Sequence, residues 1–296
     1  MSLLEIKKKI GGVKNTKKIT KAMQLVAASK MQQFQKKAQS VKSFTFDLLN
    51  SLYSQEICNQ SSVFTKHKNT RKHLFVLYTS DKGLCGPLNT KLINALFRSK
   101  KWNDLDEDSR SLIVIGKKAC EYVKNRNIKT LHSFKALPEK LDDIDALNVI
   151  DKIIDAFLNQ DIDKVYLIAP HYKNSFTNYP VVKQFLPFSK AMLEEHFKIE
   201  EDAKVEAKNN DTMSYYPEDK SLVLDHLYRQ IISSLFLQAF MELKAAEYSN
   251  RMIAMKNATD SADNMIKDLT RTYNKARQAA ITQEIAELIG ATSAME

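Results

Sequence analysis

The sequence contains little glycine, little proline and little cysteine. Among its 296 residues there are six glycines, six prolines and three cysteines. So few turn-forming residues exclude an all-β chain with many tight turns and favour long helices. Cys58, Cys85 and Cys120 are widely spaced and include no CxxC pair, which argues against a disulfide framework or a zinc site and favours a reducing compartment. We therefore expect no metal and no cofactor.

Long apolar runs are also missing. No stretch approaches the 18 or so consecutive apolar residues of a transmembrane helix. The first residues, MSLLEIKKKI, lack the apolar segment of a secretory signal and the Arg- and Ser-rich character of an organellar transit peptide. The simplest expectation is a soluble protein that acts where it is made, in a bacterial cell.

Acidic residues are outnumbered. The chain has 45 Lys and Arg against 35 Asp and Glu, a formal net charge of +10. A basic excess of this size implies an acidic partner, which could be nucleic acid, anionic lipid or an acidic protein surface. Composition alone does not choose among the three.

What the sequence does contain is a long stretch without helix breakers. Between Pro217 and Gly290 there is no proline and no glycine, and an uninterrupted helix of about 70 residues would be about 105 Å long. Its apolar positions step by alternating fours and threes, an a/d heptad that predicts a supercoiled seam against a partner helix. These positions are Met241, Ala245, Tyr248, Met252, Met255, Thr259, Ala262, Ile266, Leu269, Tyr273, Ala276 and Ala280.

A second long helix is predicted over residues 3 to about 56. The same alternation runs from Leu3 to Leu52, and Ile19, Met23 and Val26 widen the stripe to one side, as expected where a seam touches something else. Antiparallel pairing of the two helices would leave one end of the longer one unpaired for about 20 Å. Gly11 and Gly12 lie inside this helix, either at a close helix approach or as tolerated weak points.

The middle of the chain alternates short apolar segments with helical ones. We expect strands at 73–80, 111–116, 128–134 and 164–170, and helices at 90–101, 117–125 and 138–157. The segment 177–188 is predicted as an edge strand because Pro180 and Pro187 cannot donate to a central ladder. The pattern predicts a small, mostly parallel, Rossmann-like α/β domain inserted between the two long helices. The expected domain bounds are 1–56, 72–205 and 217–296.

The first helix carries charge of one sign. Lys7, Lys8, Lys9, Lys14, Lys17, Lys18, Lys21 and Lys30 occur without an intervening acid. Like charges repel on an isolated helix, so we favour an acidic partner surface over a merely solvated face. Lysine rather than arginine argues for diffuse attraction and against bidentate recognition of bases. A coiled coil associated with nucleic acid remains an alternative.

Candidate chemistry is confined to one turn. SDKGLCGPLN (80–89) follows a predicted strand and precedes a predicted helix, where backbone N–H groups could cradle a phosphate. It matches neither GxGxxG nor GxxxxGK[ST], and we favour a structural loop in which Cys85 is an inert, small apolar side chain. A nucleotide-binding enzyme built on the α/β domain is the second alternative. Nothing else assembles a catalytic triad or a metal set.

Three further stretches carry a family resemblance. NTKKITKAMQLVAASKM (15–31), RMIAMKNATDSADNMI (251–266) and YNKARQAAITQEIAELIG (273–290) strongly resemble the gamma subunit of the rotary F-type ATP synthase. The turn DKGLCGPLN (81–89) is similar to that family's glycine loop, with Pro87 where a second glycine is usual. The matches lie at both ends and in the middle, so the resemblance covers essentially the whole chain.

The resemblance implies a rotor rather than an enzyme. In the family the terminal helices form an antiparallel coiled coil that turns inside a hexamer of alternating alpha and beta subunits, a 3:3:1 assembly with the rotor. The inserted α/β domain lies beside the epsilon subunit and the membrane c-ring, and proton flow drives the rotation that changes the catalytic beta sites. This implies no catalytic residue, no small-molecule substrate, no nucleic acid, and a peripheral location on the cytoplasmic side of a bacterial inner membrane.

Individual positions also follow from the resemblance. Arg277, Gln278 and Thr282 match family residues that hydrogen-bond a catch loop of the surrounding subunits. Met23 and Arg251 match positions near the rotor–stator contact. The lysine run would face the acidic lower rim of the catalytic subunits.

Overall fold

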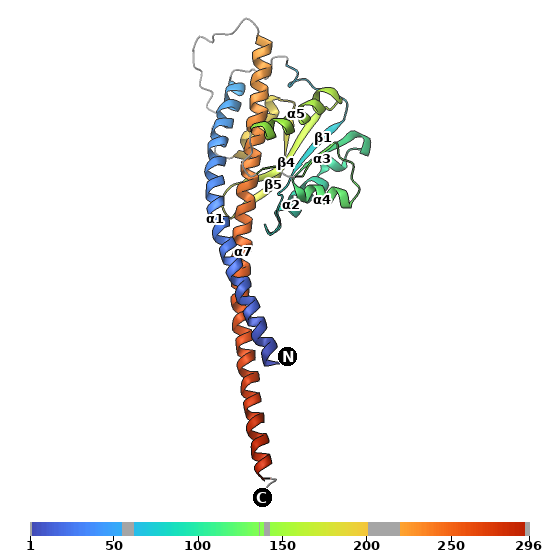
Figure 1. Ribbon diagram of the computed structural model, residues 1–296. Coiled ribbons are helices and arrows are strands. Elements are labelled where there is room, and N and C mark those ends of the chain that lie inside the picture. Colours follow the sequence, from blue (N-terminus) through green and yellow to red (C-terminus); the bar gives the residue numbers. More distant parts are fainter. Residues whose placement is uncertain (1, 55–61, 136, 139–142, 201–219, 294–296) are drawn as a thin grey trace. The chain divides into compact units, whose positions relative to one another are not determined.

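The computed structural model describes residues 2–54, 62–135, 137–138, 143–200 and 220–293. Two long helices, α1 (Leu3–Ser54) and α7 (Lys220–Ser293), flank in sequence a five-stranded sheet with shorter helices (Figure 1). The chain forms two compact units: the coiled-coil unit, Met1–Ser29 with Arg251–Glu296, and the sheet unit, Lys30–Asn250. The expected bounds 1–56 and 217–296 follow the helices, whereas the compact units divide within both helices.

The start of α1 is fixed by a capping box formed by Ser2 and Glu5. The backbone N–H of Ser2 donates to Oε2 of Glu5 at 3.0 Å, and the N–H of Glu5 donates to Oγ of Ser2 at 3.2 Å. This reciprocal pair satisfies two of the N–H groups that a helix start leaves without partners.

In the coiled-coil unit the two helices pair in antiparallel fashion. The hydroxyls of Thr20 and Thr259 lie 2.8 Å apart, and Nζ of Lys17 lies 2.5 Å from Oδ1 of Asp263. The heptad positions of both helices here are buried or half-buried, including Ile6, Ala27, Met255 and Ala262, while most positions between them are exposed. The predicted seam is therefore confirmed.

The antiparallel register leaves one end of α7 without a partner helix. Because Thr20 lies opposite Thr259, the register places Ser2 opposite Arg277. No described residue of α1 lies opposite 278–293, a stretch about 24 Å long as a helix. The predicted unpaired end is thus present at the C-terminal end of α7.

The sheet unit contains one mixed sheet in the order β3-β2-β1-β4-β5. The strands are β1 (His73–Tyr78), β2 (Arg110–Ile115), β3 (His132–Phe134), β4 (Lys164–Tyr172) and β5 (Asn178–Leu186). The first four are parallel, and β5 pairs antiparallel with β4 at the edge, as the two prolines predict. β3 is shorter than expected, because Ile128 and Leu131 donate to Val123 and Leu112 in the turn before it.

Helices connect the first four strands, and one more helix follows β5. They are α2 (Leu88–Phe97), α3 (Lys100–Asn103), a 3₁₀ turn (Glu107–Ser109), α4 (Lys117–Asn125), α5 (Asp143–Asn159) and α6 (Lys190–Glu200). The helix expected over 90–101 is two helices, because the Ser99 side chain accepts the N–H of Trp102 and caps α3. Right-handed crossovers place α2 and α4 on one face of the sheet and α5 on the other. Residues 139–142, in the predicted helix 138–157, and residues 201–205, at the end of the predicted α/β domain 72–205, lie outside the described residues.

The order of the strands creates a topological switch point. From β1 the chain moves to β2 on one side, and it later returns to β4 on the other side. The carboxyl ends of β1 and β4 therefore frame a crevice of the kind that binds ligands in open α/β sheets. What occupies this crevice decides whether the fold offers a small-molecule site.

Candidate partner-contact surfaces

The loop at the end of β1 folds around its own polar side chains. Oδ1 of Asn89 accepts the backbone N–H of Ser80 at 3.0 Å, and its Nδ2 donates to Oγ of Ser80 at 2.9 Å and to Sγ of Cys85 at 3.4 Å. Gly86 adopts φ +58°, a left-handed turn that glycine allows without strain. Cys85 is 1% exposed. The loop is held by its own side chains, which agrees with the structural interpretation.

The crevice at the switch point is occupied by α7. Phe236 stacks on Tyr78 of β1 with ring centroids 5.8 Å apart, and Phe240 lies 6.0 Å from the same ring. Two turns further, Nζ of Lys244 lies 3.9 Å from Oδ2 of Asp81. The place where an enzyme of this fold would bind a nucleotide therefore holds a helix of the same chain.

The electrostatics of this crevice are those of a packed interface. Burial raises the pKa of Asp81, against the opposing effects of the Lys117 N–H, which donates to Oδ1 at 3.1 Å, and of Lys244. Burial also raises the pKa of Tyr78 well above its usual value, with smaller contributions from Asp81 and Glu247. These shifts follow from exclusion of water by α7.

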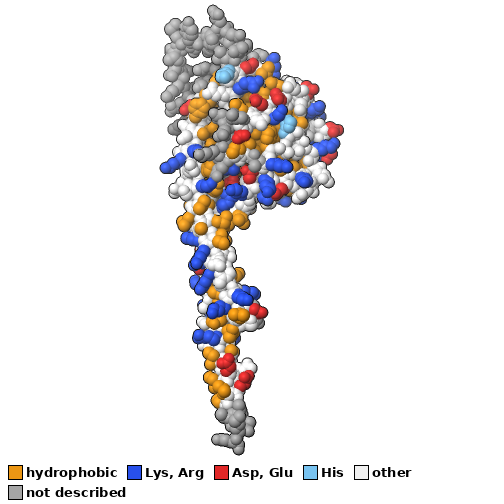
Figure 2. All heavy atoms as spheres, viewed as in Figure 1, with side chains coloured by type: hydrophobic (Ala, Val, Ile, Leu, Met, Phe, Trp, Pro, Cys, Tyr) orange, Lys and Arg blue, Asp and Glu red, His pale blue; other side chains and the backbone are white. Residues whose placement is uncertain are grey.

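The unpaired end of α7 carries three of the predicted contact residues. Arg277, Gln278 and Thr282 are all exposed, and the Thr282 hydroxyl donates to the Gln278 carbonyl of its own helix at 2.9 Å. Apolar side chains accompany them: Ile281, Ile285, Leu288 and Ile289 are 46%, 51%, 69% and 61% exposed. Figure 2 shows apolar side chains gathered along this end. An exposed apolar stripe of this kind marks a surface for a partner.

The other two predicted contact residues lie within the paired part of the coiled-coil unit. Met23 is half-buried and stands among exposed apolar neighbours: Ile19, Leu25 and Val26 are 61%, 62% and 57% exposed. Arg251 is only 7% exposed, so most of its side chain is packed within the chain. The register places Met23 opposite Lys256, more than 20 Å along α7 from Arg277. The five residues therefore form two separate groups.

The lysine run is partly engaged within the chain. Lys7, Lys8, Lys9, Lys14, Lys18 and Lys21 are exposed, whereas Lys17 pairs with Asp263 at 2.5 Å and Lys30 lies over the Tyr248 ring at 5.4 Å from its centroid. Figure 2 shows Lys and Arg side chains along this part of the molecule. An acid of α7 thus offsets some of the like-charge repulsion that α1 alone would suffer.

Two features are absent from the described residues. No helix there has both the length and the apolar character needed to cross a membrane. No group of three or more His, Cys, Asp or Glu side chains there could hold a metal ion. Gly11 and Gly12 have open space around the position of a Cβ atom, so no close helix approach within the chain requires them.

Comparison with known proteins gives the family. A family model described as ATP synthase matches residues 2–295, and relatives that match over nearly their whole length are named ATP synthase gamma chain. This chain belongs to the ATP synthase gamma chain family. The gamma chain of Legionella pneumophila (strain Corby) is 34% identical over 298 residues, which cover 98% of each chain. That of Staphylococcus epidermidis (strain ATCC 12228) is 31% identical over 299 residues, covering 100% of this chain and 99% of the relative.

Solved structures show the same fold for this gamma-family chain. A chain of the Euglena gracilis mitochondrial ATP synthase (OSCP, F1 and c-ring) matches with a TM-score of 0.67 at 17% identity, covering 99% of this chain and 94% of that one. A chain of the Tetrahymena thermophila mitochondrial central stalk and c-ring matches with a TM-score of 0.58 at 24% identity, covering 81% and 99%. The predicted combination of long terminal helices and an inserted α/β domain is confirmed.

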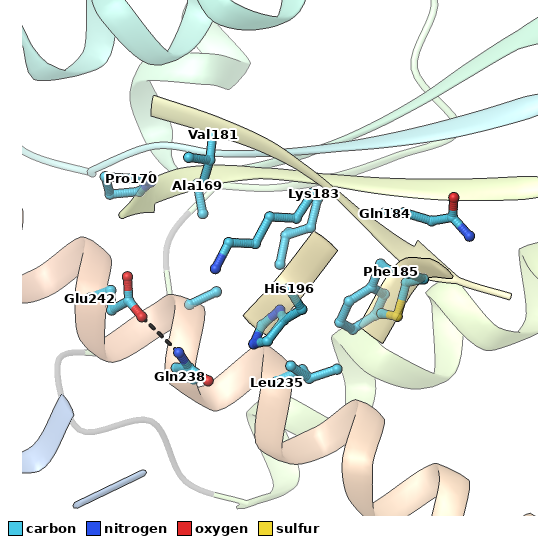
Figure 3. A pocket seen from close by; sticks show the side chains of 13 residues that line it. Ala169, Pro170, Val181, Lys183, Gln184, Phe185, His196, Leu235, Gln238 and Glu242 are labelled. Atoms are coloured by element: carbon cyan, nitrogen blue, oxygen red, sulfur yellow. Dashed lines mark hydrogen bonds between the residues drawn. The ribbon is translucent and has the colours of Figure 1, made fainter. Parts of the chain in front are cut away.

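Sequence reasoning missed the polar residues with which α7 enters the crevice. Gln238 and Glu242 are 3% and 6% exposed, and they face the β4–β5 side of the sheet across a cavity of about 40 Å³ (Figure 3). Their signal in the sequence is an amide and an acid inside the otherwise apolar segment SLFLQAFMEL (234–243). A heptad description does not distinguish such positions from solvated ones.

Proposed function

We propose that this chain is the rotor of the central stalk of an F-type ATP synthase. It transmits rotation between a proton-driven c-ring and a catalytic hexamer of alpha and beta subunits, and so couples proton transport to ATP synthesis. The observation that carries the proposal is the family match over residues 2–295. The relatives are named ATP synthase gamma chains, and the solved neighbours belong to rotor, F1 and c-ring assemblies. Neither alternative, a nucleic-acid-associated coiled coil or a nucleotide-binding enzyme, receives support.

The unpaired end of α7 is the part that turns inside the hexamer. A single helix is narrower than a helix pair, and the exposed Arg277 and Gln278 reach outward from it among small residues such as Ala279. In this proposal Arg277, Gln278 and Thr282 form hydrogen bonds with a surrounding loop during part of each turn. The Thr282 hydroxyl already donates within its helix, so it offers its oxygen to the partner as an acceptor.

The lysine-bearing face of α1 meets the acidic rim of the catalytic subunits. Exposed Lys7, Lys8, Lys14 and Lys18 are flexible point charges, which attract an acidic surface without fixing one geometry. Such contacts suit a surface that moves past its partner. Met23, with its exposed apolar neighbours, contacts the same subunits nearby, and the buried Arg251 supports that region from within the coiled-coil unit.

The chain itself performs no catalysis in this proposal. Its switch-point crevice holds α7 through Phe236 and Lys244, and the ATP sites belong to the beta subunits. The assembly places the chain at the cytoplasmic side of a bacterial inner membrane, as a peripheral component that contacts the c-ring and an epsilon subunit.

Co-purification tests the proposal. An affinity tag on this chain should retain two kinds of larger nucleotide-binding subunit from detergent-solubilised membranes, each in several-fold excess over the tagged chain by native mass spectrometry. The purified assembly should hydrolyse ATP, whereas the isolated chain should not. Recovery of the chain alone, or with DNA that is released by moderate salt, would contradict the assignment.

A further inference from the structure

The part of α7 that fills the switch-point crevice is attached to the sheet unit by polar contacts at several positions along the helix axis. On its apolar side Phe236 and Phe240 pack on Tyr78. Apolar contact of this kind is strong but non-directional. It holds the helix against the sheet, but it gives little resistance to rolling of the helix about its own axis.

Glu242 makes directional hydrogen bonds that oppose rolling of α7 about its own axis. Its Oε2 accepts the backbone N–H of Tyr172 at the end of β4 at 3.1 Å, and lies 3.4 Å from Nδ1 of His171. Its Oε1 accepts Nε2 of Gln238 at 2.8 Å, the bond drawn in Figure 3. The His171 and Glu242 side chains are 6% and 8% exposed. The carboxylate thus joins a strand end to the helix inside the protein.

A second attachment lies two turns further along the same helix. The Ser249 hydroxyl donates to the backbone carbonyl of Ser175, in the turn between β4 and β5. Nδ2 of Asn250 donates to Oδ1 of Asn178 at the start of β5 at 3.0 Å. Residues 242 and 249 are separated by about 10 Å along the helix axis. The hairpin 171–178 is therefore bonded to α7 at two positions along the helix axis, residue 242 and residues 249–250.

The hairpin that receives these bonds is itself closed by side-chain hydrogen bonds. Oδ1 of Asn174 accepts the N–H groups of Phe176 and Thr177 at 2.9 and 2.8 Å, which closes the turn. A third contact comes from the loop after β1, where Asp81 lies near Lys244 and accepts the N–H of Lys117 at the start of α4. The contacts therefore reach the ends of β4 and β5 and the loop that follows β1.

An apolar residue could hold this interface at least as well. Burying a carboxylate is costly, and replacing buried charged groups by packed apolar ones is often neutral or stabilising. Hydrogen bonds differ in that they require a defined distance and angle. The advantage of Glu242 is thus in fixing the azimuth of the helix rather than in the strength of packing.

We propose that Glu242, Ser249 and Asn250 are positioning residues that lock α7 against rolling and sliding relative to the sheet, so that torque received by the sheet unit reaches the shaft. The inference rests on the proposed rotor function and deepens it. α7 continues as one helix from Lys220 to Ser293, so torque applied to its attached part is passed along the same helix.

The test compares ATP hydrolysis with ATP-driven proton pumping in membrane vesicles that contain the assembled complex. The variant is Glu242→Met, which has no carboxylate or amide oxygen, with Ser249→Ala and Asn250→Ala. Each hydrogen bond removed favours a slipped arrangement about fivefold, so pumping per ATP should fall several-fold while hydrolysis continues. The matched control is Ser233→Ala, which removes an α7 hydroxyl bonded only to the Arg229 carbonyl of the same helix; its pumping ratio should stay unchanged.

A reversible lock separates positioning from stability. Glu242→Met with Ser249→Ala is combined with Asn178→Cys and Asn250→Cys, whose native side chains are in contact. Oxidation to a 178–250 disulfide should restore the pumping ratio, and reduction should lower it again in the same vesicles. The same oxidation without the introduced cysteines should change nothing.

The outcomes are distinguishable. An unchanged ratio in the triple variant, or an oxidised ratio equal to the reduced one, would overturn the lock while leaving the rotor function intact. If the triple variant does not assemble, Asn178→Cys with Asn250→Cys in a chain that keeps Glu242 and Ser249 supplies the comparison of oxidised with reduced complex. Failure of the wild-type chain to assemble with ATPase subunits would instead refute the proposed function.

Discussion

The hydroxyls of Thr20 and Thr259 face each other at 2.8 Å inside an otherwise largely apolar seam. One hydroxyl donates to the other, and the second donates to a carbonyl of its own helix; the candidate acceptors are the Lys17 carbonyl, 3.0 Å from Thr20 Oγ1, and the Met255 carbonyl, 2.8 Å from Thr259 Oγ1. A buried polar pair is satisfied fully in one register, so it selects that register over a shifted one. The pair thereby determines how many residues of α7 extend beyond α1.

Replacing the two threonines by valine should show that their hydroxyls stabilise the helix pair through one shared hydrogen bond. Each single change, Thr20→Val or Thr259→Val, removes the shared bond and should lower the free energy of unfolding by about 1 kcal/mol. The double variant should cost little more than either single one, because the same bond is lost. Thermal unfolding by circular dichroism measures this. Thr272→Val is the control, since the exposed Thr272 bonds only the Asp268 carbonyl. Additive losses would show that the hydroxyls do not interact.

Gly116 should be intolerant of a side chain. It follows β2 with φ +98°, and a Cβ atom there would lie 2.1 Å from the backbone oxygen of Thr79. Gly116→Ala should therefore destabilise the sheet unit by more than about 3 kcal/mol. Gly12→Ala, in open space on a helix, should instead stabilise by up to about 1 kcal/mol. A soluble, normally melting Gly116→Ala chain would contradict the described packing.

Substitutions at the unpaired end of α7 should leave the stability of the chain unchanged. Arg277→Ala with Gln278→Ala alters exposed positions, so the free energy of unfolding should change by less than about 0.5 kcal/mol. We expect weaker coupling between ATP turnover and rotation in the assembled complex, because the contact with the surrounding subunits is lost. Arg271→Ala is the control, an exposed arginine in the paired part of the coiled-coil unit. Loss of fold in the double variant would assign these residues a structural role.

Acid should weaken the sheet unit through His73. Burial chiefly, and then Lys164, lowers the pKa of this imidazole, although Asp163 opposes the shift. In the unfolded chain a histidine titrates near about 6.5. Below that pH the unfolded chain binds a proton that the folded one does not, so the free energy of unfolding falls as pH decreases from about 6.5.

His73→Gln should therefore reduce the slope of stability against pH below neutrality. Melting temperatures measured from neutral to mildly acidic pH check this, with His226→Gln as the control that removes an exposed imidazole. An identical slope in His73→Gln and the wild-type chain would show that other groups cause the acid sensitivity.

Periodicity predicted most of the fold because its signals are local. The heptad from Met241 to Ala280 required only the sequence spacing, and the edge position of β5 followed from the missing N–H groups of Pro180 and Pro187. The unpaired end followed from the different lengths of the two helices. These features depend on single elements or on simple geometry.

The remaining features depend on contacts between distant parts of the chain. Glu242 and Tyr172 are far apart in sequence, and nothing near either residue indicates that the carboxylate accepts a strand-end N–H. Likewise, the burial of Arg251 and the ion pair of Lys17 with Asp263 arise from helix pairing. The sequence of the lysine run shows no acid because the acid that pairs with Lys17 lies on the other helix.

The most direct test of the rotor account is observation of rotation. The alpha and beta subunits are fixed to a surface, and a probe is attached to this chain through Asp108→Cys, an exposed position in the sheet unit, with the native cysteines replaced by alanine. Addition of ATP should turn the probe continuously in one direction, and inhibition of hydrolysis should stop it. A probe that stays still while the complex hydrolyses ATP would contradict the account.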